Sequence, residues 1–379
     1  MSAFADSLSQ ELAKLQEKKL HRQLRLPHGL DLSSNDYLCL SQHPQVLQGL
    51  QEGIRLYGAG SGASRLIRGH RDVFAEVEAC FAEWVGAETS LLLANGFAAN
   101  LGLINAIANP KTTVYTDRLN HASILDGIRL SRAKRKYYNH LDMQQLQRLC
   151  EKDAHGTAKI IVSETTFSMD GDIPDLQELL HLKQKYNAVL ILDEAHALGV
   201  LGEKGAGVCH LPEYVKQDLA NIDFRVYTAG KSLGLEGAFV ACSQQAKDYL
   251  TNKMRTFIYS TAPMPCIAHA MLTAIPLLQS MQAERESLLQ NARFLVESLQ
   301  AMGYDTLDTQ SQIIPVLLPD EAGALRLSQY LQERGFDIRA IRPPTVPQSR
   351  LRISVNAGIQ RQDLENLLAH MRSYQAKAE

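Results

Sequence analysis

The sequence Val-Leu-Ile-Leu-Asp-Glu-Ala-His at residues 189–196 combines an apolar run with an abrupt change to charged and polar side chains. Four consecutive large apolar residues predict a buried strand, so Asp193 and His196 would lie just beyond its carboxyl end. Similar apolar runs, separated by helical stretches, recur at residues 90–93, 160–162 and 238–241. This alternation predicts an α/β fold with a mostly parallel sheet between helices.

The pattern changes toward the C-terminus. A long helical stretch at residues 287–303 precedes apolar runs at 313–318 and 351–355, with another helix between them. A chain of 379 residues is long enough for about two to three domains. We therefore expect an N-terminal helix and linker segment (residues 1–45), a large α/β domain (46–270) and a small C-terminal α+β domain (271–379).

Near the N-terminus, Leu8, Leu12 and Leu15 occur at helical spacing among Glu, Lys and Gln. They predict an amphipathic helix whose apolar stripe packs against another surface, such as a partner subunit. The glycine-rich sequence GAGSGAS at residues 58–64 predicts a loop.

Composition excludes several classes of protein. The 39 Lys and Arg residues against 41 Asp and Glu give a net charge of −2, which argues against a nucleic-acid partner. The six cysteines form no C-x-x-C pair, so we expect reduced, mostly buried thiols rather than a zinc site or a disulfide framework. The sequence has neither a secretory apolar block nor a run long enough to cross a membrane, so we expect a cytoplasmic protein without membrane contact.

Four apolar runs lead directly into polar residues, and ligands of doubly wound sheets gather at such strand ends. The residues concerned are Asn95-Gly96-Phe97, Ser163-Glu164 with Ser168 beyond them, Asp193 to His196, and Thr228 to Lys231. A buried Asp193 needs a cation or strong donors, although a lone aspartate at a strand end often caps a helix. Asp193 and His196 could be half of a metal site, but further ligands do not follow, so we expect no metal.

Lys231 lies among small residues in Thr-Ala-Gly-Lys-Ser-Leu-Gly. An amine exposed there could form a Schiff base, although most lysines are simply solvated. A phosphate-binding P-loop is disfavoured because position 225 is Arg rather than Gly, and residues 58–64 do not fit the dinucleotide-binding pattern. One cofactor, pyridoxal 5′-phosphate (PLP), would use all four strand ends, because it needs an amine, a carboxylate for its ring nitrogen and donors for its phosphate.

The ordered motifs of the chain resemble those of the α-oxoamine synthases, a family of fold type I PLP-dependent transferases. The motifs are SSNDYL (33–38), NGFAAN (95–100), DRLNHAS (117–123), FSMDGD (167–172), DEAH (193–196), TAGK (228–231) and RLRIS (350–354). The resemblance implies condensation of an amino acid with an acyl thioester and loss of carbon dioxide. Residues 340–347 (AIRPPTVP) are similar to the branch that joins L-alanine to a pimeloyl thioester, carried on coenzyme A or acyl carrier protein, in biotin biosynthesis. Another branch, using glycine or a different acyl thioester, is the alternative.

The resemblance also implies roles for individual residues. Lys231 would form the aldimine and act as base, Asp193 would pair with the ring nitrogen, and His121 would stack on the ring. His196 would bind the phenolic oxygen of the ring, with Ser168 nearby. The phosphate would be held by Gly96, Phe97, Thr228 and, from the neighbouring subunit of a homodimer, Thr261. Substrate would be bound by Arg352 assisted by Asn35, and by His121, Thr345 and Arg22.

Two of these residues have simpler interpretations on their own. His121 could be a packed core histidine, and Arg22 could be a solvated charge at a basic helix end. Arg350 lies beside Arg352 in a predicted strand, and we expect it to point to the opposite face.

Overall fold

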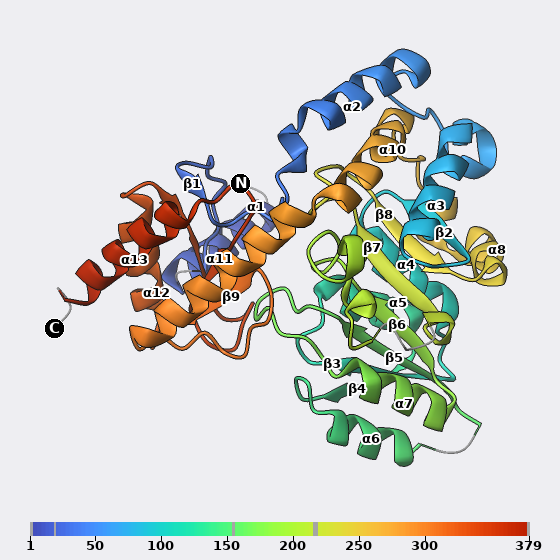
Figure 1. Ribbon diagram of the computed structural model, residues 1–379. Coiled ribbons are helices and arrows are strands. Elements are labelled where there is room, and N and C mark those ends of the chain that lie inside the picture. The colour runs from blue at the N-terminus through green and yellow to red at the C-terminus, as the bar shows by residue number, and fades with distance from the viewer. Residues whose placement is uncertain (1–2, 19, 154–155, 215–218, 377–379) are drawn as a thin grey trace.

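A seven-stranded sheet forms the centre of the larger part of the molecule (Figure 1). The computed structural model describes residues 3–376 except 19, 154–155 and 215–218. The strands of the sheet are β2 (Thr89–Leu93), β3 (Thr112–Asp117), β4 (Lys134–Tyr138), β5 (Ala158–Glu164), β6 (Val189–Asp193), β7 (Phe224–Thr228) and β8 (Ala238–Cys242). They lie in the order β2-β8-β7-β6-β5-β3-β4, and β8 alone among them runs antiparallel to its neighbours. This arrangement confirms the predicted mostly parallel α/β sheet.

Helices cover both faces of the sheet because its strands are apolar on both sides. In β5, Ile160 and Val162 pack into one hydrophobic cluster, whereas Ile161 packs into the other. The first cluster lies under α4 (Gly96–Ile107), α5 (Ala122–Ser131) and α8 (Gln244–Lys253), with the short α9 (Arg255–Ile258) beside them. The second lies under α3 (Asp72–Trp84), α6 (Met143–Glu151), α7 (Leu176–Tyr186) and α10 (Pro265–Ser280).

Strands β3 and β4 lack the apolar runs that identified the others. Strand β3 is fully buried but contains three threonines, and β4 at the edge of the sheet exposes Lys134 and Arg135. An edge strand of this kind is charged because its outer side faces water. The apolar runs therefore miss two adjacent strands at one end of the sheet, although they identify β2 at the other end.

The C-terminal part is an α+β unit, as predicted. Its three-stranded antiparallel sheet has the order β11-β12-β9. Its elements are α11 (Gln282–Ala301), β9 (Ile313–Leu317), α12 (Glu321–Gln332), β10 (Phe336–Asp337), β11 (Arg339–Ile341), β12 (Arg350–Ser354) and α13 (Arg361–Gln375). Near the N-terminus, β1 (Leu30–Asp31) pairs with β10, while α2 (Pro44–Tyr57) packs against α10. The division of the chain at residues 45 and 270 remains a prediction.

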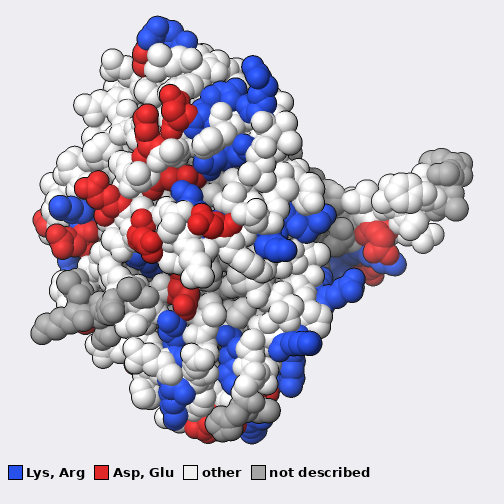
Figure 2. All heavy atoms as spheres, turned by 90° about the vertical axis from the view of Figure 1, so that its right-hand side faces the viewer, with Lys and Arg blue, Asp and Glu red and all other residues white. Residues whose placement is uncertain are grey.

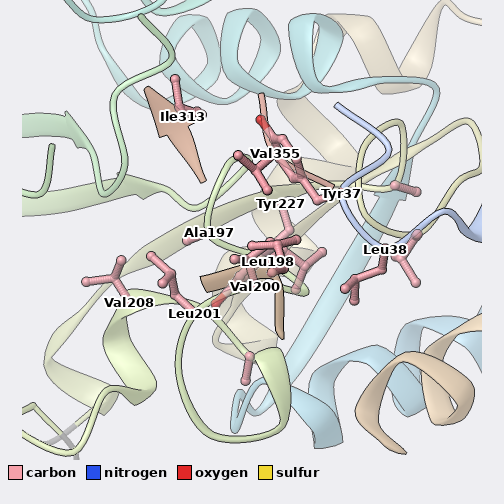
Figure 3. Packing of buried hydrophobic residues seen from close by; sticks show 14 of the residues in the cluster. Tyr37, Leu38, Ala197, Leu198, Val200, Leu201, Val208, Tyr227, Ile313 and Val355 are labelled. Carbon is pink, nitrogen blue, oxygen red and sulfur yellow. The ribbon is translucent and has the colours of Figure 1, made fainter. Parts of the chain in front are cut away.

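One hydrophobic core joins the two units. Figure 3 shows Tyr37 and Leu38 of the N-terminal segment near Ala197 and Leu198 of the large unit, with Val355 of the small unit close by. All five residues are at most 1% exposed. The N-terminal segment is therefore part of the hydrophobic core that the two units share.

The predicted N-terminal helix forms as α1 (Ala3–Glu17), but its apolar stripe is not covered within the single chain. Leu8 and Leu12 are each 49% exposed and Phe4 is 72% exposed. The packing partner predicted for this stripe is therefore not the described part of the same chain.

Residues 58–64 lie outside regular helix and strand, as predicted for a loop. All six cysteines are free thiols and four of them are buried. Within the described ranges, every helix is too short or too polar to be a membrane span. Figure 2 shows Lys and Arg interspersed with Asp and Glu over one face of the molecule.

A buried ionic network underlies the loop after β5. The two ring N–H groups of His140 donate hydrogen bonds of 3.1 Å to Asp117 and 2.8 Å to Asp172. Next to them, Arg350 of β12 forms a buried ion pair with Asp170. Burial alone would lower the pKa of His140, but its bonds to the two carboxylates raise it to about 10. Both ring nitrogens then carry protons at neutral pH, so His140 is a cation between two carboxylates.

The charge of His140 should make the stability of the fold depend on pH. Its folded-state pKa lies above the ordinary value of 6.5, so its stabilisation is complete below pH 6.5 and is lost as the pH rises toward about 10. We expect His140→Gln to lower the free energy of unfolding by roughly 1–3 kcal/mol at pH 6 and by much less at pH 10. Urea unfolding followed by circular dichroism at both pH values measures this, and an equal loss at both would contradict it.

Candidate active site

The polar residues predicted to follow the strands meet at the carboxyl edge of the large sheet. Asp193 and Glu164 are register neighbours at the ends of β6 and β5. Lys231 follows β7, and its titration is influenced by both carboxylates. His121 caps the N-terminus of α5 after β3, and it interacts electrostatically with Asp193 and Lys231. The structure therefore brings Asp193, Lys231 and His121 together, as predicted from the sequence.

Asp193 is only 5% exposed, and two hydrogen bonds hold its carboxylate in place. Its Oδ2 accepts a hydrogen bond of 2.6 Å from Asn100 Nδ2, and its Oδ1 accepts one of 2.9 Å from the backbone N–H of Ala195. The same Asn100 amide donates to Ser123 Oγ at 3.1 Å, and Ser123 Oγ lies 2.8 Å from His121 Nδ1. These bonds fix the position of the Asp193 carboxylate and the orientation of the His121 ring.

Lys231 and Glu164 share an environment that disfavours charge. Burial lowers the pKa of Lys231 to about 8, even though Asp193 and Glu164 favour its protonated form. Burial and the charge of Asp193 raise the pKa of Glu164 to about 8. Glu164 Oε1 also accepts a hydrogen bond of 2.6 Å from the backbone N–H of His121. A fraction of the Lys231 side chains is therefore an uncharged, nucleophilic amine near neutral pH.

His196 is buried next to this group, and its pKa lies well below the ordinary value because of burial and the nearby charges of Lys231 and Arg352. Its Nδ1 is 2.7 Å from the hydroxyl of Tyr37. That hydroxyl donates to Asn35 Oδ1 at 3.0 Å, and the same oxygen accepts a bond of 3.1 Å from Arg352 Nη2. Since the single Tyr37 proton is already used, the network assigns the donor role to His196 Nδ1 and leaves Nε2 as an acceptor.

Arg352 is positioned by three hydrogen bonds. Besides the bond to Asn35, its Nε donates to the backbone oxygen of Ser168 and its Nη1 to Ser354 Oγ, both at 2.7 Å. The predicted assistance of Asn35 is therefore present. Ser168 contacts Arg352 through its main chain, and the hydrogen bonds of the described residues leave its hydroxyl without a partner.

The prediction that Arg350 points away from Arg352 is wrong. Residues two apart in a strand lie on the same face of the sheet, and both arginines reach the loop after β5. Arg350 binds Asp170 there, two residues beyond Ser168. That loop presses closely against β9: Gly171 has φ +72°, and a Cβ at this position would lie 2.2 Å from the Ile313 carbonyl oxygen.

A cluster of hydrogen-bond donors lies at the start of α4. Asn95 caps the helix by accepting a bond of 2.9 Å from Ala98 N, and backbone bonds among the described residues leave the N–H groups of Gly96 and Phe97 unused. A Cβ on Gly96 would lie 3.6 Å from Thr228 Oγ1, so the Thr228 hydroxyl is adjacent. Unpaired N–H groups at a helix N-terminus favour a phosphate or carboxylate.

Thr261 does not join this arrangement within the single chain. It is exposed on the segment before α10, where its neighbour Ala262 donates to the Ala63 carbonyl oxygen at 3.0 Å. The hydrogen bonds of the described residues do not connect Thr261 with Thr228.

A cavity of about 710 Å³ adjoins His121 and Ser168. It is lined by residues 118–122, 125, 167–170 and 343–347. Arg22 donates to Thr345 Oγ1 at 3.3 Å, across 323 residues of sequence. Two of the predicted substrate contacts, Arg22 and Thr345, are therefore neighbours, and Thr345 lines this cavity.

Four site residues have no role in the sequence-based prediction: Asn100, Ser123, Glu164 and Tyr37. Glu164 is among the residues that the strand-end rule identified, but nothing in the sequence assigned it a role. Asn100 lies one turn into the helix that follows β2, and its amide reaches Asp193 at the end of β6. Tyr37 is 159 residues from His196, and nothing in their spacing indicates contact.

Comparison with known proteins gives consistent matches. The model of the family "Aminotransferase class I and II" matches residues 27–371. An 8-amino-7-oxononanoate synthase of Geobacter sulfurreducens is 39% identical, over 96% of this chain and 97% of the relative.

Two solved structures are similar over most of their length. A serine palmitoyltransferase from S. paucimobilis with a bound PLP–myriocin aldimine has a TM-score of 0.90 and 27% identity, covering 98% of each chain. An 8-amino-7-oxononanoate synthase from Francisella tularensis has a TM-score of 0.81 and 29% identity, covering 93% of this chain and 99% of the other. These matches confirm the fold and the resemblance predicted from the sequence. The chain belongs to the class I and II aminotransferase family, in which its curated relatives include 8-amino-7-oxononanoate synthases.

Proposed function

We propose that this chain is a PLP-dependent acyltransferase that condenses L-alanine with a pimeloyl thioester, releases carbon dioxide and forms 8-amino-7-oxononanoate for biotin synthesis. The observation that carries the proposal is the pairing of a buried carboxylate, Asp193, with an amine of lowered pKa, Lys231, at one sheet edge. The names of the similar proteins support the substrate assignment.

The residues at the sheet edge fit PLP. Asp193 would face the ring nitrogen, because a charged carboxylate that is 5% exposed is best balanced by a cation. The N–H groups of Gly96 and Phe97 and the hydroxyl of Thr228 would hold the phosphate. His121 would lie against the ring, and Nε2 of His196 would accept a hydrogen bond from its phenolic hydroxyl. When bound, PLP supplies an electron sink that stabilises negative charge on the amino-acid Cα.

The chain's own residues then bind the substrate and move its protons. The fork of Arg352, already oriented by Asn35 and Ser168, binds the carboxylate of alanine. The neutral amine of Lys231 takes the proton from Cα, because its lowered pKa makes it a base near neutral pH. Glu164 lies close enough to influence that proton electrostatically.

The acyl chain of the thioester would occupy the cavity beside His121. Its walls are largely apolar, with Leu119, Phe167, Met169 and the prolines of residues 343–347 contributing side chains. An apolar cavity of this size suits a chain of methylene groups. Thr345 and Arg22 would contact the substrate from one side.

We also propose a homodimer with shared sites. The exposed apolar stripe of α1 needs a cover that the described part of its own chain does not provide. Thr261, exposed and away from Thr228, would complete the phosphate site of a partner subunit.

A grid of substrates tests the proposed function. Alanine, glycine and serine are combined with pimeloyl-, acetyl- and succinyl-coenzyme A, and thiol and carbon dioxide release are measured. We expect the highest kcat/KM for alanine with pimeloyl-coenzyme A. Lys231→Ala should fold normally and lose at least about a thousandfold in kcat. A preference for glycine or for a shorter thioester would instead support a sister synthase.

The lowered pKa of Lys231 predicts how the apoprotein captures PLP. The rate of capture, followed by the absorbance of the bound coenzyme, should rise with pH to a midpoint near 8. Asp193→Asn removes a charge that favours the protonated amine, so it should move the midpoint to lower pH. Asp126→Asn, a change on α5, serves as the control. A midpoint near 10.5 would contradict the assignment.

The dimer is tested at the apolar stripe of α1. We expect the double variant Leu8→Glu and Leu12→Glu to raise the dissociation constant of the dimer at least about tenfold, because it places charges in a covered apolar surface. Gln10→Glu, on the same helix, should have little effect. Sedimentation velocity measures both, and an unchanged dimer in the double variant would show that α1 lies outside the interface.

A further inference from the structure

The cavity beside His121 has one cationic group that the described part of the chain leaves without a partner. Arg118, in the loop between β3 and α5, is exposed and lines the cavity. Hydrogen bonds and ion pairs among the described residues do not involve its guanidinium. A guanidinium that makes no hydrogen bond within the described part of the chain has all its N–H donors available for a ligand. Its planar shape suits a carboxylate.

Most other polar groups of the lining are already used. Asp170, the one acid among the lining residues, is neutralised by Arg350. The side-chain amide of Asn120 donates to Thr116 Oγ1 at 2.8 Å and to the Val162 carbonyl oxygen at 2.9 Å. Thr345 accepts the bond from Arg22. The cavity therefore presents a positive rim to any acyl chain that enters it.

The position of Arg118 along the chain also fits. Its Cα is three residues from that of His121, so the two are at most about 10 Å apart. His121 interacts electrostatically with Asp193 and Lys231, and so marks the reacting end of the cavity. A seven-carbon acyl chain extending from that end can therefore bring a terminal carboxylate within reach of the arginine side chain.

We propose that Arg118 binds the terminal carboxylate of the acyl chain and thereby selects dicarboxylic thioesters over monocarboxylic thioesters of the same length. This inference rests on the proposed function, since it names what the acyl cavity recognises. Arg118 is a specificity-determining residue, remote from the atoms that react. Arg22 is the competing cation, but it already has a hydrogen-bond partner at the cavity, Thr345.

The test compares pimeloyl- with heptanoyl-coenzyme A, which differ only in the terminal carboxylate. The holoenzyme is assayed with alanine for the ratio of the two kcat/KM values. We expect Arg118→Gln to lower this ratio about tenfold or more and Arg118→Lys to retain part of it, because lysine keeps the charge without the fork. Arg129→Gln, a change of an exposed arginine on the adjoining helix α5, is the matched control and should leave the ratio unchanged.

A binding measurement separates recognition from turnover. Titration calorimetry with S-(6-carboxyhexyl)- and S-heptyl-coenzyme A, thioethers that cannot react, should show the same loss of selectivity in Arg118→Gln. Equal losses for both ligands would mean that Arg118 binds the coenzyme A phosphates or has a structural role, and would overturn the proposal. So would an unchanged ratio, or a loss of selectivity in Arg22→Gln alone. Failure of the wild-type protein to turn over any thioester would instead refute the proposed function.

Discussion

The structure of the site depends on the cost of placing Asp193 out of water. A charged carboxylate that is 5% exposed must be compensated by donors or by a cation. Two fixed donors, the Asn100 amide and the Ala195 N–H, supply part of this compensation. They cannot neutralise the charge, so Lys231, which interacts electrostatically with Asp193, is a remaining partner, and the proposed function adds the cationic ring of PLP. The strand order that puts β6 between β5 and β7 is what brings these groups together.

The loop of residues 167–172 links the large unit, which carries Asp193, to the C-terminal unit. Arg352 donates to the Ser168 carbonyl oxygen and Arg350 pairs with Asp170, so two arginines of β12 bind one loop of the large unit. The same loop forms a wall of the acyl cavity. In the proposed reaction the amino-acid carboxylate and the acyl chain would therefore be positioned by a single segment. A change at Arg350, which has no proposed contact with substrate, would disturb both binding sites through that segment.

Sequence reasoning identified what local rules determine. The end of an apolar run located Asp193 and Lys231, because strand ends share an edge wherever the strands are parallel. The contact between Tyr37 and His196 depends on how the N-terminal segment crosses the core, and sequence spacing carries no such information. Strand β4 lacks an apolar run because it begins with the exposed residues Lys134 and Arg135, whereas β2 at the other edge is buried and apolar. The error at Arg350 was of another kind, since the two-residue period of a strand already places it on the same face as Arg352.

Burial at the sheet edge sets both the reactivity of Lys231 and the state of its neighbours. The same loss of solvent lowers the pKa of Lys231 to about 8 and raises that of Glu164 to about 8. A proton near neutral pH is therefore distributed between an amine and a carboxylic acid of similar affinity, with Asp193 as the nearby fixed charge. His196 remains neutral because it is buried beside two cations. In the proposed function, a ring held by Asp193 would lie near a proton shared by Lys231 and Glu164, near the neutral imidazole of His196 and near the guanidinium of Arg352. The first would serve proton removal at Cα, and the guanidinium would bind the carboxylate of the amino acid.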